Sequence, residues 1–238
     1  MKRTLQTMGY LIKSIVNPTL LALVVMIIML AIIDFTNFST GRFSLAGPAK
    51  PLTIPLEFFS GGLSLLIGAA IFLTNFRVSL ANGISRKTFM LANLPVAMLI
   101  AAFFAIATQV VTEVHALFWP INTYSVAMLI EHPQLSDAWP LIFQFTLYLF
   151  LILSGRLITL VYYRCNKWGR GFLSLVPLVV FYFILSAING KNGEFYLLMT
   201  NLLLLFLQPQ NSIIFLVLGS LVMFALSWLV ICRAPLKD

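Results

Sequence analysis

Charged side chains are scarce in this sequence, and acidic ones are the scarcest of all. Asp and Glu together number 7 among 238 residues, and charged residues of both signs make up 9%, against about a quarter in a soluble globular protein. Apolar residues account for 61%, and the mean hydropathy is +1.00. Because no stretch has the composition of a soluble block, we expect one membrane-embedded domain covering residues 1–238.

Cysteine is nearly absent as well, and its placement does not suggest a disulfide framework. Cys165 and Cys232 both fall in segments that the charge distribution, described below, places on the cytoplasmic side. Thiols in the cytoplasm are kept reduced. We therefore expect two reduced cysteines.

The sequence also lacks the motifs of the common catalytic and nucleotide-binding sites. It contains no G-x-x-x-x-G-K-[S/T] phosphate-binding loop, no H-E-x-x-H and no G-x-S-x-G. The His and Glu residues between 112 and 137 match no metal-ligand spacing. The apolar segments lack the carboxylates that ion-coupled carriers use. We therefore expect no enzyme activity, cofactor or metal in this chain, and an energy source outside it.

Long apolar runs are what the sequence has in abundance. A helix that crosses about 30 Å of hydrocarbon needs roughly 20 mostly apolar residues, and its backbone must be hydrogen-bonded internally. Six segments meet this requirement, and we number them as predicted spans one to six: 18–35, 54–76, 89–111, 138–162, 172–188 and 212–231. They predict an all-α membrane protein with six transmembrane helices.

Basic residues are distributed unequally between the two sides of these spans. With the N-terminus on the cytoplasmic side, 12 of the 15 Lys and Arg residues fall in or next to inner segments and 3 in outer ones. This is the positive-inside pattern of membrane proteins. It predicts that both termini are cytoplasmic, and it accounts for the net charge of +8 without nucleic-acid binding.

The N-terminal residues predict a helix on the membrane surface. Residues 1–16 place apolar side chains at helical spacing, with Lys2, Arg3 and Lys13 mainly off that stripe. This pattern is typical of an interfacial helix on the inner leaflet, and a frayed basic tail is the alternative. Asn17 and Pro18 then predict a cap and a first helical turn for span one.

Three further features stand out within or between the predicted spans. Ser60, Ser64 and Gly68 recur at four-residue spacing, which favours close helix packing or a pathway-lining face. Arg156 lies one to two turns from the inner end of span four, so we favour a side chain that snorkels to the headgroups, with a polar lining role as the alternative. The run 195–208 is too short to cross and too apolar for water, which predicts a re-entrant or outer-leaflet segment.

The predicted inner loop between spans two and three is short and basic. Its sequence, NGISRKTF, occupies residues 82–89. This stretch resembles the coupling segment of bacterial ABC exporter permeases, whose fold is shared with the G-subfamily of ABC exporters (the type V fold). The N-terminal basic helix resembles their elbow helix, and the run 195–208 resembles their outer re-entrant helices. The motif covers eight residues, whereas the architecture covers the whole chain.

The resemblance implies a permease subunit that exports an amphipathic or hydrophobic substrate, such as a drug, a lipid or a membrane-active peptide. It would lie in the bacterial cytoplasmic membrane and pair with a second permease, identical or related. Two copies of a separate cytoplasmic ATPase would bind ATP and Mg²⁺. The implied ATPase-coupling residues are Asn82, Gly83, Ile84, Ser85, Arg86, Lys87, Thr88 and Phe89, with Arg164, Lys167 and Arg170 as a secondary contact.

On that model, residues 82–89 form a short cytoplasmic coupling helix. Gly83 allows the turn, Arg86 and Lys87 meet acidic groups of the ATPase, and Phe89 anchors the segment to span three. Spans two and five would flank the pathway. Two other classes of function stay open: a non-transporting membrane scaffold or sensor, and an intramembrane enzyme such as a protease.

Overall fold

The computed structural model describes residues 2–39, 56–118, 138–166 and 209–232, together with positions 168, 169, 171 and 175. All the regular structure in these ranges is α-helical, which agrees with the predicted fold class. The helices are α1 (Lys2–Ser39), α2 (Leu56–Ala81), α3 (Arg86–Phe118), α5 (Trp139–Arg164) and α8 (Pro209–Cys232).

Five helices in the described part of the chain are long and apolar enough to cross a membrane. They coincide with predicted spans one, two, three, four and six. The apolar stretches are Thr4–Ile32, Phe59–Ala81, Arg86–His115, Trp139–Arg164 and Asn211–Ile231. Predicted span five (172–188) and the apolar run 195–208 lie outside the described residues.

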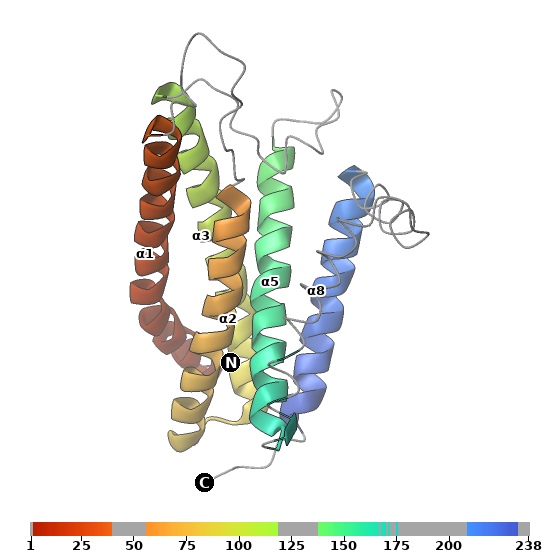
Figure 1. The fold of residues 1–238 in the computed structure, drawn as a ribbon. Coiled ribbons are helices and arrows are strands. Elements are labelled where there is room, and N and C mark those ends of the chain that lie inside the picture. The colour runs from red at the N-terminus through yellow and green to blue at the C-terminus, as the bar shows by residue number, and fades with distance from the viewer. Residues whose placement is uncertain are drawn as a thin grey trace.

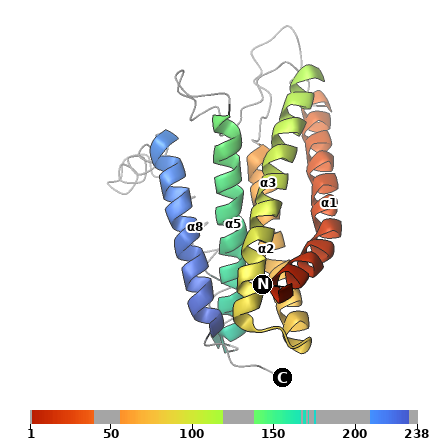
Figure 2. The ribbon, with the colours of Figure 1, turned by 180° about the vertical axis from the view of Figure 1, so that it is seen from behind.

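The five helices form an elongated bundle in which α5 is central (Figures 1 and 2). It packs against α2, α3 and α8, while α1 packs against α2 and α3 on one side of the bundle. Helices α1 and α8 lie at opposite sides (Figure 1). Their outward faces are strongly apolar and exposed, as expected for surfaces in contact with lipid rather than water.

The charged residues separate between the two ends of the bundle. The start of α1, the connection between α2 and α3, and the last turns of α5 and α8 all lie at one end (Figure 1). We call it the basic end, because the elements there carry Lys2, Lys13, Arg77, Arg86, Lys87 and Arg164. The acidic residues Glu57, at the start of α2, and Glu113, near the end of α3, lie toward the other end.

Helix α1 corrects one expectation from the sequence. We expected separate helices before and after Asn17, but α1 is continuous from Lys2 to Ser39 and contains Pro18 in its interior. Proline lacks the backbone N–H of a helical residue and bends the helix. The Thr19 hydroxyl donates to the carbonyls of Ile15 and Val16 at 3.0 and 2.9 Å, a bonding mode that also bends helices. The first turns of α1 accordingly run across the bundle at the basic end (Figures 1 and 2).

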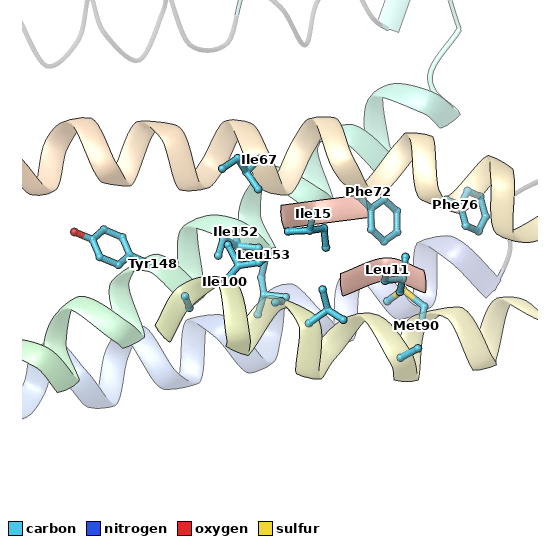
Figure 3. Close-up of a cluster of buried hydrophobic side chains, with 14 of the residues drawn as sticks. Leu11, Ile15, Ile67, Phe72, Phe76, Met90, Ile100, Tyr148, Ile152 and Leu153 are labelled. Atoms are coloured by element: carbon cyan, nitrogen blue, oxygen red, sulfur yellow. The ribbon is translucent and has the colours of Figure 1, made fainter. Parts of the chain in front are cut away.

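These first turns of α1 belong to the protein core. Leu11 and Ile15 are buried in the same cluster as Phe72, Phe76 and Met90 (Figure 3). On the adjoining face of the segment, the apolar side chains of Leu5, Ile12 and Val16 are exposed. The segment therefore has one apolar face toward the other helices and another toward its surroundings.

The contact between α2 and α5 depends on two glycines. A Cβ atom at Gly68 would overlap the backbone carbonyl of Ile152, and one at Gly155 would overlap the carbonyl of Leu65. The two backbones therefore approach closely, as small residues permit in membrane helices. The Thr159 hydroxyl crosses the same contact and donates to the Ala69 carbonyl at 3.1 Å.

Candidate functional site

The candidate site lies at the basic end, where four residues connect α2 to α3. Gly83 has a φ of +72°, a left-handed conformation that glycine adopts without a steric penalty. Its N–H donates to the Leu80 carbonyl at 3.0 Å, and the N–H of Ile84 donates to the Ser79 carbonyl at 3.0 Å. This pair of bonds is the Schellman motif, which ends a helix by satisfying its last carbonyls.

Helix α3 begins directly after this motif. Ser85 Oγ accepts a hydrogen bond from the backbone N–H of Thr88 at 3.2 Å and shares a second one with the Thr88 hydroxyl at 2.8 Å. A serine that bonds to the third helical residue is a standard N-cap. The connection thus contains no separate coupling helix, which corrects the sequence expectation. Residues 82–85 form a hydrogen-bonded turn, and Arg86–Phe89 are the first turn of α3.

Phe89 attaches the turn to the bundle. Its side chain is fully buried, and its ring centroid lies 5.4 Å from that of Phe72 and 5.5 Å from that of Phe76. Aromatic pairs at these separations attract each other beyond the effect of area burial. Both partners are on α2, so Phe89 joins the start of α3 to the second half of α2.

The two basic residues of the stretch have different environments. The guanidinium of Arg86 donates from Nη1 to the carbonyl of Ile231 at 3.4 Å, in the last turn of α8, where the helix dipole favours a positive charge. The side chain of Lys87 is exposed. Lys87 therefore faces outward at the basic end, whereas Arg86 links α3 to α8.

A groove separates the turn from the first turns of α1. Its volume is about 510 Å³, and its lining combines Gln6, Thr7 and Tyr10 of α1 with residues 82–85 and Thr88. We call it the turn groove. The bend of α1 creates it, because the bend carries the N-terminal segment over the end of the bundle.

Of the three basic residues expected to form a secondary ATPase contact, the structure describes one, Arg164. Arg164 is exposed in the last turn of α5, at the same end as the turn groove. One residue before it, the Tyr163 ring lies 5.5 Å from the Arg77 guanidinium, within the range of a cation–π interaction. Lys167 and Arg170 lie outside the described residues.

The small residues of α2 face α5. Ser60 Oγ and the Tyr148 hydroxyl share a hydrogen bond of 2.6 Å, and the Tyr148 hydroxyl lies 3.0 Å from Thr108 Oγ1 on α3. Ser64 is fully buried, with its hydroxyl bonded to the Gly61 carbonyl at 2.8 Å. Gly68 completes the row against Ile152. The row therefore makes a packing contact within this chain.

Arg156 does not snorkel, contrary to the sequence expectation. Its side chain is 2% exposed. Nη2 donates to Oδ1 of Asn93 at 2.9 Å, and the guanidinium carbon lies 5.2 Å from the centre of the Phe72 ring. The Nε and Nη1 atoms are buried and make no hydrogen bond. An intramembrane arginine held between α2, α3 and α5 is a second candidate functional group.

Sequence reasoning missed Asn93, Thr108 and Tyr148. They are isolated polar positions within the mostly apolar helices α3 and α5, and no spacing rule links residues on different helices. The only available signal was the four-residue spacing of Gln144 and Tyr148 on one face of α5. The hydrogen-bond partners of Asn93, Thr108 and Tyr148 lie on other helices, so these contacts depend on the packing of the bundle.

Within the described ranges no three His, Cys, Asp or Glu side chains gather as metal ligands would. Comparison with known protein families, with curated proteins and with solved structures gives no match to this chain.

Proposed function

We propose that this chain is the permease subunit of an ATP-driven exporter, working with a separate cytoplasmic ATPase that binds ATP and Mg²⁺. The observation that carries the proposal is the junction between α2 and α3. Two long helices are joined by four residues, with a Schellman motif on one side and a serine cap on the other. A force applied to this turn would reach both helices without being absorbed by a flexible loop.

The lengths of the two helices support the same proposal. Helix α2 has 26 residues and α3 has 33, so at 1.5 Å per residue they measure about 39 and 50 Å. Both exceed the hydrocarbon core of a bilayer, about 30 Å. The junction would therefore project beyond the hydrocarbon on the cytoplasmic side, which we assign to the basic end from the positive-inside rule.

In this proposal the turn groove receives a segment of the ATPase. Lys87, exposed beside it, would attract an acidic group of the partner, and Arg164 would add a secondary contact. The first turns of α1 would act as the elbow helix, because they form the other wall of the groove. Two such permeases, identical or related, would enclose a path for an amphipathic or hydrophobic substrate across the bacterial cytoplasmic membrane.

The decisive experiment purifies the tagged chain with its ATPase from its native membrane and reconstitutes the complex in vesicles. We expect vanadate-sensitive ATP hydrolysis that Lys87→Glu lowers by weakening ATPase capture. The matched control is Glu113→Lys, a charge reversal at an exposed position on α3 toward the opposite end of the bundle, which should retain capture. Equal capture by both variants would refute the docking assignment. A chain that purifies without any ATPase would favour the scaffold or sensor alternative.

A further inference from the structure

A second groove runs along the outside of the bundle between α1 and α2. Its volume is about 530 Å³, within the range of about 300–1,000 Å³ that is usual for small-molecule sites. Ala22 and Ile67 are buried at its floor, and the exposed side chains of Leu21 and Leu66 border it. We call it the lateral groove.

The lateral groove is polar at one end and apolar along the rest. Near the basic end its lining includes Tyr10, Ser14, Thr74 and Asn75, and the Asn75 amide donates to Ser14 Oγ at 2.9 Å. Farther along, α2 contributes only apolar residues as far as Leu63. From Asn75 to Leu63 the groove extends over twelve residues of helix, about 18 Å.

This gradient matches an amphiphile that lies along the helices with its headgroup toward the basic end. Lys13 is exposed and precedes Ser14 in the chain. Among the lining residues that the structure describes, none is acidic. A basic residue at headgroup depth attracts anionic lipids.

We propose that the lateral groove binds an acyl chain of an anionic phospholipid, with the headgroup near Lys13 and the polar end formed by Ser14 and Asn75. The site follows from the bend at Pro18, because the two parts of α1 take different directions across α2. The proposal is independent of the proposed transport function, since the lipid would bind in the absence of any ATPase.

The test reconstitutes the full chain in bilayers that contain a photoactivatable phospholipid with a diazirine on one acyl chain. Two probes with the same chains are compared, one with a phosphatidylglycerol headgroup and one with phosphatidylcholine. We expect the phosphatidylglycerol probe to label lateral-groove residues preferentially. Lys13→Gln should lower that preference about fivefold, the factor that corresponds to about 1 kcal/mol per basic residue near an anionic surface.

A second variant tests occupancy of the groove itself. Ala70 is exposed in the lining, so Ala70→Trp would fill the space that the chain occupies and should remove the labelling. Val222→Trp, at an exposed position of α8, is the matched control and should leave it unchanged. Thermal unfolding of both variants in detergent verifies that they are folded.

Three results would overturn the proposal. If the two probes label the groove equally, and Lys13→Gln does not change this labelling, the probes are in ordinary contact with bulk lipid. Unchanged labelling of Ala70→Trp would place the probe elsewhere. Disulfide-linked dimers formed by Ala70→Cys in a chain without its native cysteines would mean that a second copy covers the groove.

Discussion

Arg156 donates a hydrogen bond from Nη2 to Oδ1 of Asn93 at 2.9 Å, and this bond joins α5 to α3 inside the bundle. The guanidinium also lies against the Phe72 ring of α2. One basic side chain of α5 thus contacts two other helices, α3 and α2, inside an apolar bundle where charges are costly. The pair is a buried polar contact between two helices, and it leads to the first prediction.

Removing Asn93 should destabilise the protein more than removing Arg156. Asn93→Leu removes the side-chain acceptor of a buried guanidinium and leaves only the longer bond of 3.4 Å to the backbone carbonyl of residue 93, which costs about 1–3 kcal/mol or more. Arg156→Met removes the charge while keeping an unbranched side chain, and such a replacement is often neutral or stabilising. Thermal unfolding in detergent measures both. If the Arg156→Met protein is stable but inactive in transport, the arginine has a functional role. Equal destabilisation by the two variants would contradict the expected difference in stability.

The contact between α2 and α5 should not tolerate a methyl group at Gly68. The added Cβ would overlap the Ile152 carbonyl, and overpacking typically costs about 1–3 kcal/mol. Gly62→Ala is the control, because a Cβ at Gly62 meets no atom within 4 Å. We expect Gly68→Ala to lower the unfolding temperature and Gly62→Ala to retain or raise it. Equal unfolding temperatures for the two variants would contradict the close approach of α2 and α5 at Gly68.

Gly83→Ala should strain the turn that connects α2 and α3. Its φ of +72° costs an L-residue about 1–2 kcal/mol, and a shift of the turn would displace the groove. Gly9→Ala in α1 meets no neighbouring atom within 4 Å and serves as the control. We expect Gly83→Ala to reduce ATPase stimulation in reconstituted vesicles. Unchanged stimulation together with unchanged stability would show that the turn geometry is unimportant.

Substitutions of Arg86 and of Lys87 should have different effects, the first on stability and the second on ATPase capture. Arg86→Gln weakens a bond to the carbonyl of Ile231 and should reduce stability by about 0.5–1.5 kcal/mol, a typical net hydrogen-bond contribution. Lys87→Gln alters an exposed side chain and should change stability by less than about 0.5 kcal/mol while lowering ATPase capture. Thermal unfolding and copurification measure the two effects. Lower capture by Arg86→Gln together with lower stability of Lys87→Gln would contradict this assignment of the two residues.

The orientation in the membrane is testable by thiol labelling. After Cys165 and Cys232 are replaced by Ser, single cysteines are introduced at Asn82 and at Ala138, both exposed and at opposite ends of the bundle. An impermeant maleimide applied to intact cells should label the cysteine at 138 and not the one at 82. Labelling at 82 alone would invert the proposed topology.

Hydropathy was sufficient to locate five helices because lipid acts as a uniform solvent. A segment of about 20 apolar residues is stable across hydrocarbon whatever its neighbours are. The same reasoning was insufficient at Asn17 and Pro18, where cap and proline signals predicted a helix start. Packing of Leu11 and Ile15 against the core (Figure 3) holds the helix together through that point, so a tertiary contact outweighed a local preference.

The sequence by itself determined that this is a protein of apolar membrane helices, that basic residues concentrate at one end, and that a short connection joins the second and third of these helices. These properties depend on composition and on neighbours along the chain. Only the tertiary structure decided that Arg86 bonds to α8, that Arg156 is buried beside Asn93, and that the bend of α1 leaves two grooves. Each of these depends on which helices lie together, and in a membrane that choice is made by close packing and polar contacts, because apolarity is common to all the helices.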